Sequence, residues 1–149
     1  MLLNLLVQSA GTTIATYLLI ANGLLATTYG WGEKNCGDIG KAVSCSKGAV
    51  TASGDLFDPE VANAAMALPT NIRMVKGLRL PLRIMHADGS YGTCHWMPVN
   101  DKMNPRYIGV RGWDLSPAAV NLLTGGKAHR KWSGKVQICE NELIIGEKK

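Results

Sequence analysis

Two aspartates flank a loop in the second half of the chain. Asp101 follows an apolar run that predicts a strand, and Asp114 lies just before a predicted helix that starts at Ser116. Ser116 is a favoured N-cap residue, Pro117 suits the first helical position, and Gly125 suits the position after the last turn. Strand ends and helix starts commonly present polar groups to a binding site. The two acids are therefore candidates for acid–base chemistry, and the alternative is a pair of structural turn residues.

The composition is that of one globular domain with a single core. The chain has 149 residues, of which 46% are hydrophobic and 18% are charged, and this length suits one domain. The net charge of +5 favours anionic partners such as acidic lipid or the anionic glycopolymers of a bacterial wall. No dense Lys/Arg run alternates with aromatic residues, so no nucleic-acid partner is expected.

The N-terminal part of the chain is uncharged from Met1 to Gly32 and mostly apolar from Ile14 to Ala26. Three interpretations stay open: a signal peptide cleaved before Thr27, a hydrophobic helix held in a membrane, or a helix packed on a partner protein. The predicted domain organisation is a hydrophobic segment over residues 1–26 and a folded domain over residues 27–149. Membrane contact or packing on a partner protein is expected to involve residues 1–26.

Four cysteines favour two disulfides in a chain with an export-like start. Three pairings are open, of which we favour Cys36–Cys45 as a local link and Cys94–Cys139 as a link between distant strands. The cysteine spacing fits no tight zinc pattern and the histidines are dispersed, so no metal and no other cofactor is expected.

Many short strands and two short helices indicate a small barrel. A hairpin turn is expected at residues 87–90, where Asp and Gly occur together. Strands are predicted near the start of 27–47, at 49–53, 72–75, 80–85, 93–99, 135–139 and 143–145, and helices at 60–67 and from Ser116 onward.

Four segments occur in an order and spacing that resembles the double-psi β-barrel of rare lipoprotein A. They are Thr51–Asp58, Ala64–Pro69, Val99–Lys102 and Asp114–Ala119. Expansins, barwin-type proteins and MltA-type lytic transglycosylases share this barrel more loosely. The resemblance covers roughly residues 27–140. It implies a mainly β fold, a six-stranded double-psi β-barrel with two short helices, preceded here by an N-terminal hydrophobic helix. It also implies a groove for a glycan strand, which is peptidoglycan in the bacterial members.

The resemblance also implies roles for individual residues. Asp101 falls on the family's Asn-Asp pair, whose Asp is thought to be catalytic, and Asp114 falls on the acid on which expansins and the MltA type rely. Asp55 stands where the family usually has Glu. Met66 stands where the family commonly has His, and His95 is a candidate to replace that His from another strand.

A lytic transglycosylase needs one carboxyl group that first donates and then accepts a proton. The protonated acid protonates the glycosidic oxygen, and the ionised acid then takes the proton of the sugar's 6-hydroxyl, which closes a 1,6-anhydro ring. Burial or a neighbouring carboxylate must therefore raise its pKa. We expect Asp101 to be this acid, with Asp114 as the rival and Asp55 orienting the sugar or tuning the acid.

Polar and aromatic residues near these acids are candidates to bind the glycan. Hydroxyl and amide groups pair with sugar hydroxyls, and aromatic rings stack on sugar faces. The polar candidates are Ser53, Thr51 and Asn100, and the aromatic candidates are Tyr29, Trp31, Trp96 and Trp113, of which at least two are expected in the core.

Three functions follow from this sequence. The first is a lytic transglycosylase that cleaves peptidoglycan outside the cytoplasm, in the periplasm or on a membrane. The second is a non-catalytic, expansin-like glycan-binding module, which Met66 and the shorter Asp55 favour. The third is a structural barrel in a phage tail tip, which contacts other tail proteins and the cell wall during entry. The first and third are compatible.

Overall fold

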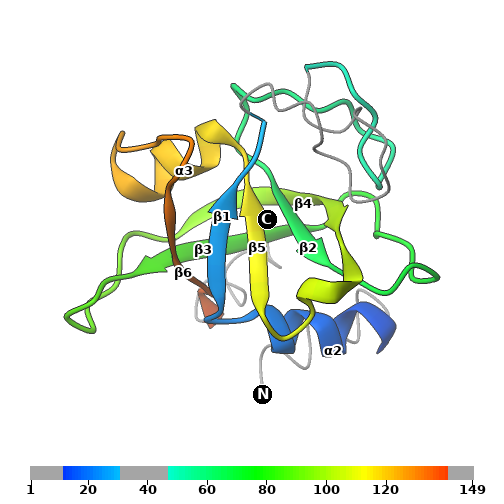
Figure 1. Ribbon diagram of the computed structural model, residues 1–149, viewed down its shortest axis with the longest axis horizontal. Helices are drawn as coiled ribbons and strands as arrows, with labels where there is room; N and C mark the ends of the chain where they lie inside the picture. The colour runs from blue at the N-terminus through cyan, green and yellow to red at the C-terminus, as the bar shows by residue number, and fades with distance from the viewer. Residues whose placement is uncertain (1–11, 31–46, 141–149) are drawn as a thin grey trace.

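The structure, a computed structural model, describes residues 12–30 and 47–140 (Figure 1). Within these residues the fold is mainly β, and six strands close into one barrel. This confirms the prediction of a mainly β fold with six strands. The elements are α2 (Thr12–Ala21), β1 (Leu25–Thr28), β2 (Ala64–Ala67), β3 (Arg79–Met85), β4 (His95–Met103), the 3-10 helix η1 (Pro105–Tyr107), β5 (Arg111–Leu115), α3 (Pro117–Thr124) and β6 (Ser133–Ile138).

The strand order around the barrel differs from the order along the chain. The strands follow one another as β1-β5-β2-β4-β3-β6, and β6 pairs again with β1. The pairs β1/β5 and β2/β4 are parallel and the other pairs are antiparallel. Parallel neighbours need a crossover connection rather than a hairpin. Strands that are distant in the sequence therefore lie side by side in the barrel.

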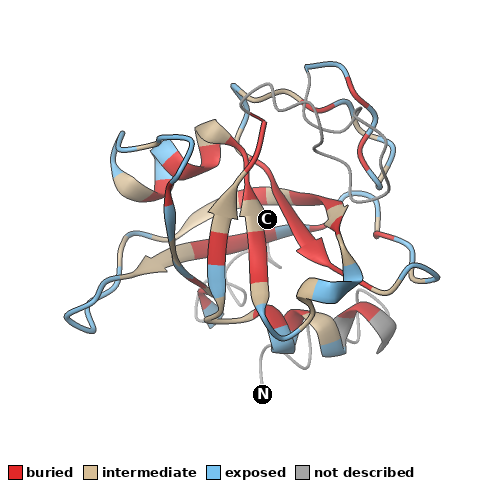
Figure 2. Cartoon of the chain, viewed as in Figure 1, coloured by how far each residue is buried: buried red, intermediate tan, exposed pale blue. Residues whose placement is uncertain are grey.

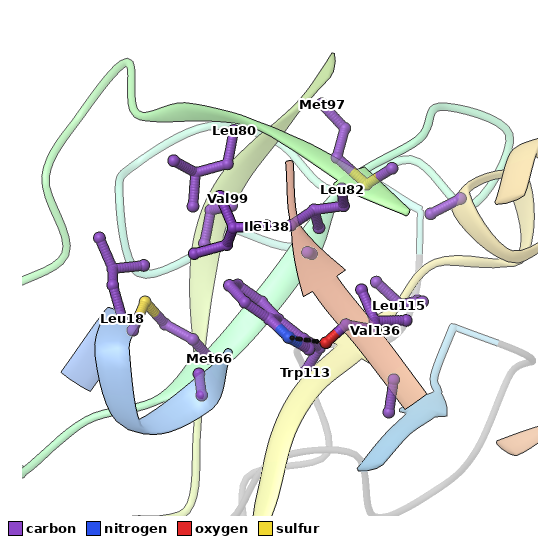
Figure 3. Packing of buried hydrophobic residues seen from close by; sticks show 14 of the residues in the cluster. Leu18, Met66, Leu80, Leu82, Met97, Val99, Trp113, Leu115, Val136 and Ile138 are labelled. Atoms are coloured by element: carbon purple, nitrogen blue, oxygen red, sulfur yellow. Dashed lines mark hydrogen bonds between the residues drawn. The ribbon is translucent and has the colours of Figure 1, made fainter. Parts of the chain in front are cut away.

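Apolar side chains from all six strands fill the barrel (Figure 3). Trp113 of β5 is completely buried at its centre, and its indole Nε1–H donates a hydrogen bond to the carbonyl of Val136, at 3.3 Å. This bond satisfies the polar atom of the indole, as a buried Trp requires. In Figure 2 red buried positions recur along the strands of the barrel, whereas the outlying loops are mostly pale blue.

Helix α2 covers the lower end of the barrel in Figure 1 and is part of its core. Ile14, Leu18 and Ala21 are buried against the strands. The domain boundary predicted after Ala26 falls inside β1, which pairs with β5 and β6 from Leu25 onward. Among the described residues, no helix combines the length and the apolar character needed to cross a membrane.

The helix predicted for residues 60–67 is wrong, because residues 64–67 form β2. The Ala-Ala-Met-Ala sequence favours a helix when isolated. In the barrel all four side chains are buried, and β4 and β5 hydrogen-bond the strand on both sides. Tertiary pairing therefore overrides the local preference.

Two of the predicted strands are also absent from the described part of the chain. Residues 49–53 make only a bridge between Val50 and Leu56. Residues 72–75 lie in a loop. The ammonium group of Lys102 donates hydrogen bonds to carbonyl groups of this loop, to Ile72 at 2.6 Å and to Pro69 at 3.0 Å. The strands predicted at 80–85, 93–99 and 135–139 are confirmed within a few residues. Strand β5 was not predicted, and the strand predicted at 143–145 lies outside the described residues.

The disulfide predicted between Cys94 and Cys139 is present. It joins the start of β4 to the end of β6 across 45 residues of sequence. The predicted pair Cys36–Cys45 lies outside the described residues.

Helix α3 begins and ends as the sequence predicts. Ser116 is the N-cap, Pro117 follows it, and Gly125 ends the helix in the left-handed conformation at φ 75°. The Ser116 hydroxyl oxygen accepts the N–H of Ala119 at 3.2 Å and the N–H of Asn63 at 3.0 Å. Ser116 therefore links the segment before β2 to the start of α3 by hydrogen bonds.

Replacement of Ser116 by Ala is expected to lower the free energy of unfolding by about 2 kcal/mol. The variant loses the N-cap bond and leaves the buried N–H of Asn63 without its acceptor. Urea unfolding measures the loss. The matched control is Ser133→Ala, an exposed position; equal stability of the two variants would contradict this role of Ser116.

Candidate functional site

A β-bulge in β4 turns Asp101 out of the barrel core. Ala64 of β2 pairs with Val99, but the next residue, Ala65, pairs with Asp101, which leaves Asn100 as the extra residue. Val99 is fully buried in the core. Without the bulge, Asp101 would point to the same face as Val99, because side chains alternate along a strand. Bulges commonly redirect a side chain in this way next to functional sites.

Four residues on neighbouring strands form a row that we name the acid row: Thr27, Asp114, Ala65 and Asp101. Ala65 pairs with Asp101 on one side and with Asp114 on the other, and Asp114 pairs with Thr27. Paired residues present their side chains on one face of a sheet, and two strand spacings separate the aspartate backbones by roughly 10 Å. The Thr27 hydroxyl donates a hydrogen bond to Oδ1 of Asp114 at 2.9 Å.

The Asp101 carboxyl group is buried and takes two backbone hydrogen bonds. Only 6% of the residue is exposed. Its Oδ1 accepts the N–H of Lys102 at 2.9 Å and that of Ala52 at 3.1 Å. Burial raises the pKa of Asp101 to about 6, although the two N–H groups act in the opposite direction. Asp101 therefore has the pKa shift that a general acid needs.

A short hairpin over residues 48–57 covers the Asp101 and Ala65 end of the acid row (Figure 1, upper right). Phe57 packs its ring on Tyr29 with the centroids 5.0 Å apart, and both lie in one buried cluster with Ala49 and Ala65. The tip of the hairpin binds β4 through the N–H of Ser53, which donates to the Asn100 carbonyl at 3.0 Å, and through the bond from Ala52 to Asp101. We name this segment the 48–57 hairpin.

Three residues predicted from the sequence lie in the turn of this hairpin and bind one another. The Ser53 hydroxyl donates to Oδ2 of Asp55 at 2.8 Å, and the Thr51 hydroxyl donates to the Asp55 carbonyl at 2.9 Å. Thr51 is buried. These side chains therefore shape the turn, and the hydrogen bond from this turn to Asp101 comes from the backbone of Ala52.

Replacement of Ala52 by Pro is expected to raise the pKa of Asp101 by about one unit. Proline removes the N–H that stabilises the carboxylate. It suits this position, because Ala52 is the second residue of a turn closed by the bond from the Gly54 N–H to the Thr51 carbonyl. Carbon-13 NMR titration of the Asp101 carboxyl measures the shift.

The matched control for this substitution is Ala52→Gly, which keeps the N–H. Its Asp101 should titrate as in the wild type. An unchanged Asp101 pKa in Ala52→Pro would contradict the assigned contact.

Tyr29 lies beside both acids but is buried. Its hydroxyl donates to Oδ1 of Asn63 at 2.8 Å. Burial, and then the charges of Asp101 and Asp114, raise the pKa of the Tyr29 phenol well above its usual value. Tyr29 therefore stays uncharged and packs on Phe57 beneath the hairpin, where its ring is not accessible to a sugar.

Asn63 is a site residue that sequence reasoning missed. Besides the Tyr29 hydroxyl, it binds the Val61 carbonyl through Nδ2 at 2.9 Å and the Ser116 hydroxyl through its backbone N–H. It joins the end of β1, the entry to β2 and the start of α3. A lone Asn before an Ala-rich run gives no sequence signal for this role.

Asn100 carries a buried polar atom that has no partner among the described residues. Its side-chain Oδ1 makes no hydrogen bond there, and only 8% of the residue is exposed. Such an acceptor is costly unless a bound group supplies a donor. Since Asn100 is the bulge residue next to Asp101, this acceptor lies beside the acid row.

The other predicted residues lie away from the acid row. Trp96 and His95 precede Asp101 by five and six residues on β4, which corresponds to about 16 Å and about 20 Å of strand. Met66 is fully buried and faces the core together with Trp113. His95 is therefore too distant to serve Asp101, and Trp113 is a core residue. Trp31 lies outside the described residues.

The described ranges contain no group of three or more His, Cys, Asp or Glu residues placed to hold a metal ion. The acid row and its two backbone donors form the candidate site. No family model matches the chain, and no curated protein matches it significantly.

Proposed function

We propose that this chain is a peptidoglycan lytic transglycosylase built on a double-psi β-barrel, with Asp101 as its single acid–base group. One observation carries the proposal: a buried carboxyl group with a pKa of about 6 lies at a β-bulge, out of the barrel core. Two interleaved parallel pairs, β1/β5 and β2/β4, within a closed six-stranded barrel support the double-psi assignment.

In the proposed reaction, Asp101 transfers its proton to the glycosidic oxygen between N-acetylmuramic acid and N-acetylglucosamine. The C1–O bond of the muramic acid breaks as this proton is transferred. The ionised Asp101 then takes the proton of the same sugar's 6-hydroxyl, whose oxygen bonds to C1 and closes the 1,6-anhydro ring. No water is consumed, and Asp101 ends protonated again.

The neighbouring residues supply charge and binding in this proposal. Asp114, held by the Thr27 hydroxyl, is the carboxylate that stabilises the positive charge developing at C1. The unpartnered Oδ1 of Asn100 accepts a sugar hydroxyl. Because Asp101 is covered, glycan binding requires the 48–57 hairpin to release its two bonds to β4, from Ala52 and Ser53.

A non-catalytic, expansin-like glycan-binding barrel is the second candidate function. Two observations favour it: Met66 in place of the family His faces the core, and the 48–57 hairpin buries Asp101. A structural role in a phage tail tip is compatible with either function.

We propose that the protein acts outside the cytoplasm, on a bacterial envelope or from a virion tail. The Cys94–Cys139 disulfide supports this location, because disulfides persist in oxidising compartments.

Incubation of the full chain with purified peptidoglycan sacculi, followed by mass spectrometry of the released muropeptides, tests the proposal. Products ending in 1,6-anhydro-N-acetylmuramic acid are the expected result. Reducing ends would indicate a hydrolase and overturn the single-acid mechanism. Protein that stays on the sacculi and releases nothing would select the binding module.

A further inference from the structure

Exposed apolar side chains gather at the end of the barrel that α2 covers. Leu19 and Ile20 lie on the outer side of α2, Leu25 begins β1, and Val110 lies in the loop before β5. These four side chains are between 38% and 67% exposed. Figure 2 shows exposed positions on this helix, and Figure 1 shows the loop before β5 beside it. We name these four residues the α2-end patch.

Arg111 connects the members of this patch. It follows Val110 directly, and it pairs with Leu25 across the parallel β1/β5 ladder. Arg111 and Ile20 also line one shallow hollow, together with Gly109. Arg111 therefore adjoins Val110, Leu25 and Ile20, and Leu19 precedes Ile20 on the outer side of α2.

Basic residues border the patch. Leu25 has Lys135 of β6 as its partner on one side and Arg111 of β5 on the other, so a basic residue stands on each side of this exposed leucine. The guanidinium of Arg111 lies 4.3 Å from the centre of the Tyr107 ring, and that of Arg106 lies 4.8 Å from it.

Among the described residues, the segments that carry the patch contain no acidic residue, and the exposed Glu140 comes just after them, beyond the end of β6. The sequence has no Asp or Glu before Glu33, none between Asp101 and Asp114, and none from Leu115 to Cys139. These ranges contain α2, β1, the loop before β5 and β6. The patch is therefore apolar, with the basic residues Arg111 and Lys135 on either side of Leu25.

We propose that the α2-end patch docks the protein on the surface of an anionic lipid bilayer. Exposed apolar side chains with Lys and Arg beside them match a surface that has acyl chains below negatively charged headgroups. In this arrangement α2 lies at the interface with its outer side chains in the bilayer boundary and its inner side chains in the barrel core. The α2-end patch shares no residue with the acid row, so docking through it does not depend on the proposed chemistry.

Sedimentation of the full chain with lipid vesicles tests this surface. The vesicles contain either phosphatidylcholine alone or phosphatidylcholine with phosphatidylglycerol. We expect binding to the anionic vesicles only, and we expect salt to weaken it. Leu19→Asp, and separately the double variant Arg106→Glu/Lys135→Glu, should each weaken binding at least about tenfold, since the first places an acid in the patch and the second replaces basic residues at its border by acids.

Matched controls separate the patch from general charge and apolarity. Leu122→Asp changes an α3 leucine that is 41% exposed, close to the 46% of Leu19. Lys127→Glu/Lys131→Glu makes the same charge change in the loop after α3 as the double variant. Both controls should bind like the wild type, and thermal unfolding verifies that every variant is folded. Absence of wild-type binding, unchanged binding of Leu19→Asp, or equal losses in the controls would each overturn the proposal.

Discussion

Asp101→Asn is expected to reduce the release of anhydro muropeptides by about 10²–10⁴-fold, the range by which general acid–base groups accelerate reactions. The variant should fold, because the Asn side-chain oxygen can accept the N–H groups of Lys102 and Ala52 as the carboxylate does. An amide has no proton to give to the glycosidic oxygen. The initial rate of product release from sacculi, followed by mass spectrometry, measures the effect.

Asparagine at the other two acids provides the comparison. Asp114→Asn should release anhydro muropeptides about tenfold more slowly than the wild type, because it removes a stabilising charge but leaves the proton transfer intact. Asp55→Asn should change the rate less than about threefold, since the Asp55 carboxylate accepts the Ser53 hydroxyl within the hairpin. A large loss in Asp114→Asn with full activity in Asp101→Asn would exchange the two roles. Unchanged rates in both would contradict an enzymatic function of the acid row.

Elements with a clear local signal could be predicted, and elements that depend on long-range pairing could not. Ser116, Pro117 and Gly125 define α3 through local capping chemistry, and the structure agrees with each of them. Residues 64–67 have a helical composition and become a strand because β4 and β5 pair with it on both sides. Local sequence preferences do not reveal which distant strands will pair with a segment.

The candidate site shows the same division. The acids Asp101 and Asp114 could be selected from the sequence, and the register places them on one face of the sheet. The bulge at Asn100, which turns Asp101 outward, depends on the alignment of β4 with β2 and has no residue signature. The donor from Ala52 is a backbone group, so no side-chain motif could predict it. Asn63 forms hydrogen bonds with residues of three separate segments, Tyr29, Val61 and Ser116, so no local sequence pattern could predict its role.

Ionisation of Asp101 is expected to cost the folded protein about 3 kcal/mol of stability between about pH 3 and about pH 7. The pKa of Asp101 is raised from 3.8 to about 6 in the folded protein, so the folded state holds this proton more tightly than the unfolded state does. The contribution to stability is therefore complete below pH 3.8 and is lost as the pH rises through about 6. Urea unfolding at a series of pH values measures this dependence.

Asp101→Asn isolates this dependence from the rest of the protein. The pKa of Asp88, on an exposed turn, is lowered by its hydrogen bonds with Ser90, and this group acts in the opposite direction over a lower pH range. It is present in both proteins and cancels in their difference. The wild type should therefore lose stability relative to Asp101→Asn as the pH rises from about 4 to about 7, and parallel pH profiles would refute the assignment. A buried carboxyl group held in this way destabilises the fold in its ionised form. Asp101→Asn, which is expected to remove the proposed activity, should thus gain stability relative to the wild type as the pH rises toward neutrality.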